Sequence, residues 1–187
     1  MVRPGGGCQT PDLPARPRPA RTTRRTPVTI HLLRHARAGR RSAWTGDDDQ
    51  RPLTKIGLRQ ADALVPRLEG LGIARIVASP YVRCRQSVEP LANRLRLPVD
   101  LADALAEGAG LDEVLRLVEK IGDEDAVLCT HGDVMLALLG YLRAEGIKVR
   151  RRNGTPPVEK GSVWELTTRR EVIARATYHP PPRPGRD

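Results

Sequence analysis

Short apolar runs alternate along the chain with longer segments in which apolar residues recur every three or four positions. The short runs have the length and composition of β-strands, and the longer segments have the period of helices buried on one face. The predicted strands lie at 28–33, 74–78, 99–101 and 125–130, the helices at 54–71, 81–96, 111–121 and 133–145, and a final pair of strands at 162–167 and 171–177. This alternation predicts an α/β fold with three α/β/α layers: a mostly parallel central sheet flanked by helices, with an antiparallel hairpin at its edge.

Residues at the ends of these segments refine the predicted boundaries. Thr54 is a suitable N-cap for the first helix, because its hydroxyl can accept a hydrogen bond from the first turn. Gly122 and Gly146 are suitable stops for the third and fourth helices. Pro66 and Pro90 fall inside helical segments, so we expect a kink or a break at each of them.

The two ends of the chain differ in composition from the middle. Residues 1–27 contain six prolines, six arginines and three consecutive glycines, and they show no apolar period. Residues 179–187 contain four prolines, and consecutive prolines cannot continue a helix or a strand ladder. We therefore expect disordered tails at 1–27 and 179–187 around one folded domain at 28–178.

The net charge of +10 invites a comparison with nucleic-acid-binding proteins. Half of this excess lies in the first 27 residues, where six arginines outnumber one aspartate. Aromatic residues, which stack on bases, make up only 3% of the chain. The distribution disfavours nucleic acid as a partner, and the modest surplus in the domain suits an enzyme that attracts phosphorylated substrates.

The cysteines and the apolar runs bear on the cellular compartment. Cys8, Cys84 and Cys129 are odd in number and lack CxxC spacing, which argues against a disulfide framework or a zinc site. No apolar run approaches the roughly 18 residues of a membrane span, and the N-terminus lacks the apolar segment of a secretion signal. We expect a cytoplasmic protein without a membrane partner, and the oligomeric state stays open.

Two of the predicted strands run directly into a histidine. The first leads into Arg34-His35 and the fourth into His131-Gly132, while the strand at 74–78 is followed by Arg83 a few residues later. In α/β sheets, ligands bind just beyond the carboxyl ends of the strands. These side chains can therefore meet in one site, where imidazole and guanidinium groups suit an anionic, phosphate-like ligand.

Phosphoryl transfer without a metal needs cationic donors for the non-bridging oxygens, an in-line nucleophile and a proton for the departing oxygen. Arg34, Arg83 and His131 can supply the cationic donors, and His35 can supply the nucleophile because imidazole is partly deprotonated near neutral pH. Gly132 lets the backbone at a helix N-terminus approach the anion closely. One carboxylic acid is still needed as the proton donor.

Four segments share the order and spacing of one family's motifs. They are Leu33–Ala36 (Leu-Arg-His-Ala), Arg51–Ala61 (Arg-Pro-Leu-Thr-Lys-Ile-Gly-Leu-Arg-Gln-Ala), Ser79–Ser87 (Ser-Pro-Tyr-Val-Arg-Cys-Arg-Gln-Ser) and Thr130–Gly132 (Thr-His-Gly). Together they resemble the motifs of the histidine phosphatase superfamily, also called the phosphoglycerate mutase-like family. The resemblance implies a phosphoglycerate mutase-like fold, a phosphorylated His35, and a phosphate pocket of Arg34, Arg83 and His131.

The resemblance also implies which carboxyl group gives the proton. The family's donor is usually a glutamate in a Leu-x-Glu context before a glycine, and Leu105–Gly108 (Leu-Ala-Glu-Gly) matches that context. Glu107 is therefore the expected general acid and base, and Asp103 is the reserve candidate. The implied activity is that of a phosphomonoesterase that needs neither a metal nor another cofactor.

The segment after His35 departs from the family's mutases. Arg37–Arg40 stand where the mutases carry Thr or Ser and Asn, and this departure favours the compact SixA-like branch over a phosphoglycerate-type mutase. Residues 160–164 resemble the phosphatase half of two-domain actinobacterial MutT-type enzymes, which act on nucleotides. The expected substrate is a phosphohistidine protein, or a nucleotide or other small phosphometabolite. The alternative is a non-catalytic module that binds phospho-ligands, which the retained His35 and Glu107 disfavour.

Two charged loops have less specific interpretations. Asp47–Asp49 do not follow an apolar strand, so we interpret them as a solvated loop and not as an aspartyl-phosphate site. Lys148 and Arg150–Arg152 form a basic loop that is either a solvated turn or a contact for an anionic substrate.

Overall fold

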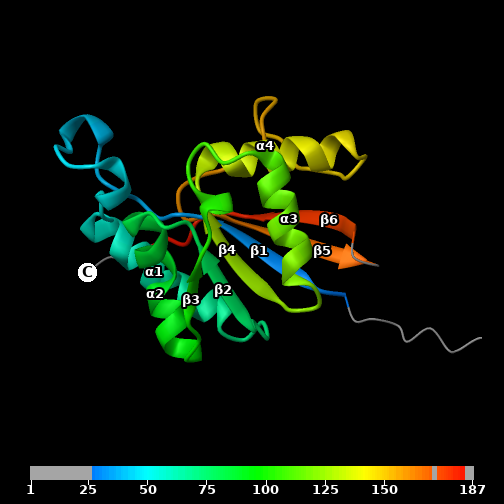
Figure 1. Cartoon of the computed structure of the whole chain (residues 1–187), viewed down its shortest axis with the longest axis horizontal. Helices are drawn as coiled ribbons and strands as arrows, with labels where there is room; N and C mark the ends of the chain where they lie inside the picture. Colours follow the sequence, from blue (N-terminus) through cyan, green and yellow to red (C-terminus); the bar gives the residue numbers. More distant parts are fainter. Residues whose placement is uncertain (1–26, 170–171, 184–187) are drawn as a thin grey trace, which may run out of the picture.

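The computed structural model describes residues 27–169 and 172–183. At the centre of the molecule is a six-stranded sheet in the order β3-β2-β4-β1-β5-β6 (Figure 1). The strands are β1 (Thr29–Arg34), β2 (Arg75–Ala78), β3 (Val99–Leu101), β4 (Ala126–Thr130), β5 (Val163–Arg169) and β6 (Val172–His179). β1 to β4 run parallel, β5 is antiparallel to β1, and β6 is antiparallel to β5. The prediction of a mostly parallel sheet with an antiparallel hairpin at its edge is confirmed.

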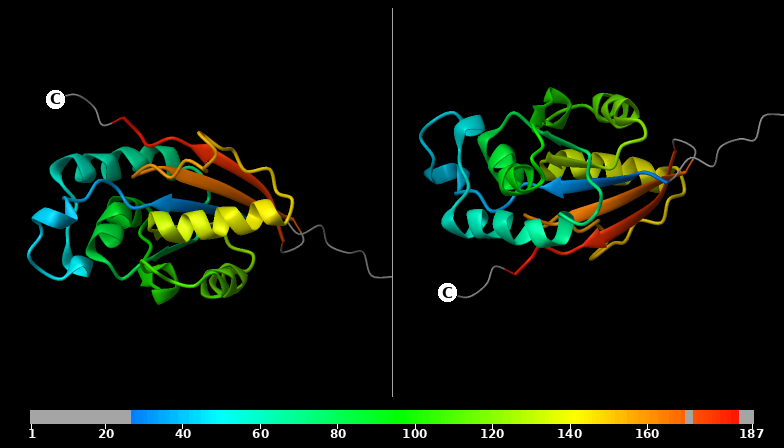
Figure 2. Two further views of the ribbon diagram at one scale, coloured as in Figure 1. Left: turned by 90° about the horizontal axis from the view of Figure 1, so that it is seen from above. Right: turned by 90° about the horizontal axis from the view of Figure 1, so that it is seen from below.

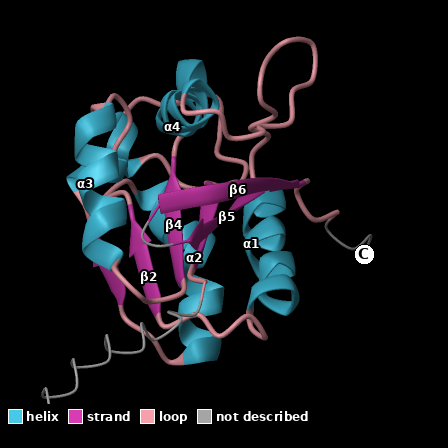
Figure 3. Cartoon of the chain, turned by 90° about the vertical axis from the view of Figure 1, so that its right-hand side faces the viewer, coloured by secondary structure: helices cyan, strands magenta, loops and turns pink. Residues whose placement is uncertain are grey.

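Helices cover both faces of the sheet. They are α1 (Lys55–Leu68), α2 (Val82–Leu95), α3 (Leu111–Ile121) and α4 (Gly132–Ala144), with short 3₁₀ helices η1 (Arg41–Ala43), η2 (Asp48–Gln50) and η3 (Asp103–Leu105) in the connections. α1 and α2 pack on one face, and α3 and α4 pack on the other (Figures 2 and 3). Within 27–169 and 172–183, no helix is both long and apolar enough to span a membrane. The expected three-layer fold is confirmed.

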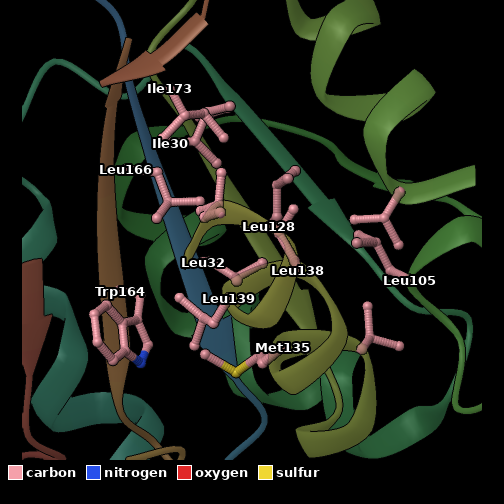
Figure 4. Packing of buried hydrophobic residues seen from close by; sticks show 14 of the residues in the cluster. Ile30, Leu32, Leu105, Leu128, Met135, Leu138, Leu139, Trp164, Leu166 and Ile173 are labelled. Atoms are coloured by element: carbon pink, nitrogen blue, oxygen red, sulfur yellow. The ribbon is translucent and has the colours of Figure 1, made fainter. Parts of the chain in front are cut away.

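Side chains of β1 alternate between two hydrophobic clusters. Ile30 and Leu32 belong to the cluster under α3 and α4, where they lie near Leu138 (Figure 4). Leu33 belongs to the second cluster, under α1 and α2, together with Leu64. Both faces of this strand are thus covered near its end, which explains why Leu32 and Leu33 are both apolar although they point to opposite faces.

The helix ends follow their capping signals. The backbone N–H of Gly57 donates to the Thr54 hydroxyl over 3.1 Å, so Thr54 is the N-cap of α1. Gly122 follows the last residue of α3 with φ of 64°, a conformation that glycine adopts without strain. Gly146 has φ of 83° and lies two residues beyond the end of α4. The three boundary predictions are confirmed.

We expected a kink or a break at Pro66 and Pro90, and a break at either residue is wrong. α1 continues through Pro66 to Leu68, and α2 continues through Pro90 to Leu95. Each proline loses one backbone hydrogen bond, but buried residues of the same helix hold the surrounding turns on the sheet. Most of a helix's stability in a protein comes from such packing, so it outweighs the local cost.

The C-terminal end of the described domain extends beyond residue 178, where we expected it to stop. His179 is the last residue of β6, and Pro182 is buried. The guanidinium of Arg67 donates to the Pro180 carbonyl oxygen over 2.7 Å, which ties this segment to α1. Nearly all of the predicted N-terminal tail, residues 1–26, and the last four residues, 184–187, lie outside the described residues.

Candidate active site

The carboxyl ends of β1 and β4 bring the two motif histidines together. The strands are neighbours in the sheet, with Arg34 paired to Thr130. One residue further, the His35 backbone N–H donates to the Thr130 carbonyl oxygen over 3.0 Å. The ring centroids of His35 and His131 are 5.2 Å apart. The expectation that two separate strands deliver their histidines to one place is confirmed by this geometry.

His35 is buried and held in one tautomer. Its Nδ1 lies 2.8 Å from the carbonyl oxygen of Ala36, and a carbonyl can only accept, so Nδ1 carries the proton. Burial lowers the pKa of His35 to about 2; the Ala36 carbonyl opposes this shift, and the neighbouring His131, Arg83 and Arg34 reinforce it. The imidazole is therefore neutral at physiological pH, and its Nε2 keeps a free lone pair for attack.

Arg83, in the first turn of α2, contacts His131 and is only 1% exposed. Its two terminal nitrogens contact different acceptors. One donates to the Asp48 carbonyl oxygen, and the other to Glu107 Oε2, each over 2.7 Å. The second nitrogen also lies 3.3 Å from Nδ1 of His131. A buried guanidinium beside two histidines is a strong binding group for a phosphate oxygen.

His131 is oriented by contacts on both sides of its ring. Arginine can only donate, so the contact with Arg83 makes Nδ1 the acceptor and leaves the proton of the neutral ring on Nε2. Nε2 lies 3.0 Å from the hydroxyl oxygen of Ser79, which follows β2. The Tyr81 ring packs edge-on at 4.8 Å between centroids. The ring of His131, which follows β4, is thus held by residues that follow β2 and by a residue of α2.

Arg34 reaches the same region across the start of α4. Its guanidinium donates to the Val158 carbonyl oxygen, while its Nε is buried without a hydrogen-bond partner. A Cβ on Gly132 would lie 2.9 Å from the guanidinium carbon of Arg34, closer than side chains tolerate. Glycine at the first position of α4 therefore makes room for the Arg34 guanidinium at the positive end of the helix.

Replacing Gly132 with alanine is expected to displace the Arg34 guanidinium and to weaken phosphate binding by about tenfold, the loss of one modest charged hydrogen bond. The measurement is the inhibition constant of inorganic phosphate, with the melting temperature as a check on folding. Gly140→Ala is the matched control, because its Cβ meets no atom within 4 Å. Equal inhibition constants in the two variants would show that Arg34 does not need this space.

The structure separates the two candidate proton donors. Glu107 Oε2 contacts both Arg83 and Arg41, each at 2.7 Å, and so lies at the guanidinium that also contacts His131. Asp103 is exposed in η3 and faces a hollow that is also lined by Arg116 and Lys120 of α3. Only Glu107 of the two is in contact with the predicted phosphate pocket.

Asp48 is a member of the site that sequence reasoning missed. We expected Asp47–Asp49 to be a solvated loop, but the Asp48 carboxylate lies 3.1 Å from Arg83 and 2.8 Å from Arg51. Hydrogen bonds from Arg41 and Arg51 hold the pKa of the Asp48 carboxyl well below its usual range. The segment between β1 and α1, which projects beyond the end of β1 in Figure 1, is thus tied back to the site. The only sequence signal for the role of Asp48 is that it lies just before the motif that begins at Arg51.

Lys160 is a second group without an assigned role in the sequence. The residues after it are bound to the first motif, since the Gly161 N–H donates to the carbonyl oxygen of Arg34 over 3.1 Å. Burial lowers the pKa of Lys160, and the charges of Arg34, Arg51, Arg37 and Arg83 lower it further. The Lys160 amine therefore lies among the arginines around the pocket. In the described part of the chain, no group of three or more His, Cys, Asp or Glu side chains could hold a metal ion.

Comparison with known proteins gives consistent matches. A family model described as Histidine phosphatase superfamily (branch 1) matches residues 30–113, a segment that ends before His131. The 8-oxo-(d)GTP phosphatase of Mycolicibacterium smegmatis is 37% identical over 161 residues, which are 82% of this chain and 48% of that protein. The phosphohistidine phosphatase SixA of Escherichia coli is 29% identical over 126 residues, which are 63% of this chain and 73% of that protein.

A solved structure supports the fold independently. The protein histidine phosphatase SixA in complex with tungstate has a TM-score of 0.62 and 21% identity, covering 84% of this chain and 97% of that one. At this identity the likeness shows the fold alone. The chain spans about half the length of the mycolicibacterial relative. The match therefore does not show that the chain has the full activity of that protein.

Proposed function

Because the chain belongs to the histidine phosphatase superfamily, we propose that it is a metal-independent phosphomonoesterase that works through a phosphohistidine on His35. The observation that carries this proposal is the buried, neutral His35 imidazole beside Arg83 and His131. Its Nδ1 proton is engaged by a carbonyl, which directs the free lone pair of Nε2 into the site. Such an imidazole is a nucleophile over the whole physiological pH range.

In the first step, Nε2 of His35 attacks phosphorus and the bond from phosphorus to the ester oxygen breaks. Glu107 gives its proton to the departing oxygen, so the alcohol leaves neutral. In the second step, water attacks the phosphorus of phosphohistidine, the P–N bond breaks, and Glu107 accepts the proton of the water. Arg34, Arg83 and His131 hold the non-bridging oxygens throughout and offset the charge of the transition state.

The ion pairs of Glu107 explain how one carboxyl group serves both steps. Glu107 is paired with Arg83 and Arg41, so its carboxyl group is held at the phosphate pocket, where it can act as a base in the second step. A bound phosphate competes for the donors of Arg83 and leaves the Glu107 carboxyl group free to transfer a proton to the departing oxygen in the first step.

Both phosphohistidine proteins and small phosphorylated molecules are candidate substrates. The mycolicibacterial relative is named as a phosphatase of a nucleotide, 8-oxo-(d)GTP, and SixA is named as a phosphatase of phosphohistidine. The contact of Glu107 with Arg83 favours substrates with an oxygen leaving group, because an alkoxide departs far more readily when it is protonated. We therefore place nucleotides and other small phosphate esters before phosphohistidine proteins.

The test is an assay of the purified protein in EDTA on p-nitrophenyl phosphate, a panel of nucleotides and a phosphohistidine peptide. We expect hydrolysis of p-nitrophenyl phosphate at the same rate with and without EDTA, since side chains supply the positive charge. A magnesium-dependent phosphatase in the same buffer checks that chelation is effective.

Two results would count against parts of the proposal. Loss of all activity in EDTA, with recovery on adding a divalent ion, would contradict the metal-independent mechanism. A kcat/KM that is highest for the phosphohistidine peptide would leave the mechanism intact and reverse the order of the substrate classes.

A further inference from the structure

Glu107 lies in a tight turn between η3 and α3. The Ala109 N–H donates to the Ala106 carbonyl oxygen over 3.1 Å, which closes a four-residue turn with Glu107 and Gly108 at its centre. Gly108 has φ of 84°, the left-handed conformation that a type II turn requires at its third position. The turn's own hydrogen bond uses neither the N–H nor the carbonyl of the central peptide between Glu107 and Gly108.

That central peptide is bound by a residue of α4. The Gly108 N–H donates to the Asp133 carboxylate oxygen Oδ2 over 2.7 Å. On the other side of the turn, the buried Thr130 hydroxyl donates to the carbonyl oxygen of Leu105 over 2.7 Å, and the Leu105 side chain is packed in the core (Figure 4). The turn is thus held before and after Glu107.

The two residues that hold the turn flank His131 and Gly132 in the sequence. Thr130 ends β4, and Asp133 is the second residue of α4. The segment 130–133 therefore presents His131 to the phosphate pocket and at the same time fastens the turn that carries Glu107. A rotation of the Glu107–Gly108 peptide would change the backbone angle of Glu107 and move its carboxyl group away from Arg83.

We propose that Asp133 is a positioning residue for proton transfer, which holds the Glu107–Gly108 peptide so that the Glu107 carboxyl group stays at the site. This inference rests on the proposed function of Glu107. Asp133 touches neither the phosphate nor the leaving group in this role; it acts through the backbone of the turn. Catalysis depends on such placement, since a displacement of about 1 Å can cost about 10²-fold in rate.

Asp133 also acts on the helix α4 and on Arg34, and an experiment must separate these two effects from its hold on the turn. A carboxylate in the first turn stabilises a helix through its dipole, and the charge of Asp133 acts on Arg34. Both effects depend on charge. The hydrogen bond from Gly108 depends only on an oxygen acceptor, which asparagine keeps and alanine lacks.

The experiment compares kcat/KM on β-glycerophosphate, an alkyl phosphate, with kcat/KM on p-nitrophenyl phosphate, an aryl phosphate. Asp133→Ala is expected to lower the alkyl-to-aryl ratio about tenfold, because only the alkyl substrate depends strongly on a well-placed acid. Asp133→Asn is expected to keep the ratio of the unchanged protein, even where a changed charge beside Arg34 raises KM for both substrates. Glu113→Ala is the matched control: it removes a carboxylate that accepts the Gly110 N–H of the same connection, outside the turn.

A double variant tests whether Asp133 acts through Glu107. If it does, Asp133→Ala lowers the ratio no further in a Glu107→Gln background, since the two residues act as a unit. An unchanged ratio in Asp133→Ala, or an equal fall in Asp133→Asn, overturns the inference while Glu107→Gln still shows a selective loss. If Glu107→Gln itself shows no selective loss, the assigned acid is wrong and the inference falls with it.

Discussion

Replacing His35 with alanine is expected to abolish turnover and phosphoenzyme formation together, with kcat lowered by about 10⁴-fold or more. The other imidazole of the site cannot take over the attack, because its Nδ1 faces Arg83 and its Nε2 faces Ser79. The phosphoenzyme is measured as acid-labile phosphate on protein quenched during turnover.

A matched histidine variant controls for general damage to the domain. His179→Ala removes an exposed imidazole at the end of β6 that pairs with Glu165, far along the chain from both motifs, and should keep the activity. Acid-labile phosphate that still forms on the His35→Ala protein would show that another residue is the nucleophile.

The second large effect is expected for Glu107→Gln, which keeps the shape of the side chain and removes its proton. General acid catalysis contributes about 10² to 10⁴ in rate, so kcat/KM on β-glycerophosphate should fall by that order. p-Nitrophenolate leaves without protonation, so kcat/KM on p-nitrophenyl phosphate should fall much less, because kcat/KM covers only the steps up to release of the leaving group. The measurement is kcat and KM of the variant on the two substrates.

Asp103→Asn is the matched control for this variant, since Asp103 was the other carboxyl group considered from the sequence. Its exposed position in η3 leads us to expect little change on either substrate. A selective loss of alkyl phosphatase activity in Asp103→Asn, or equal losses on both substrates in Glu107→Gln, would reverse the assignment of the acid. The nucleophile and the phosphate pocket do not depend on that result.

Sequence reasoning was most successful where a periodic pattern coincided with a strand or helix that is buried. The order and type of the regular elements, the parallel sheet and the antiparallel hairpin follow from such patterns. The convergence of His35 and His131 follows as well, because strand ends in a parallel sheet share one edge. The helices do not break at Pro66 and Pro90, since a local rule on proline says nothing of the burial that holds the neighbouring turns.

Sequence reasoning was least successful in the connections. Asp48 was interpreted as solvated, although the fold places its carboxylate on Arg83, 35 positions away in sequence. No period constrains such a loop, and the energy of an ion pair depends on distance and burial that only the folded chain defines. The same holds for Lys160, whose charged neighbours in space come from three separate segments of the chain.

The sequence by itself thus determined the chemical groups of the site and the sheet edge at which they gather, because apolar periodicity and strand direction are local properties. Only the tertiary structure decided which carboxyl group reaches Arg83. Glu107 and Asp103 are four residues apart in one irregular connection, and the choice between them depends on the turn at 106–109 and on its hydrogen bonds to Thr130 and Asp133. Those contacts join segments that are about 25 residues apart in sequence, so no local pattern specifies them.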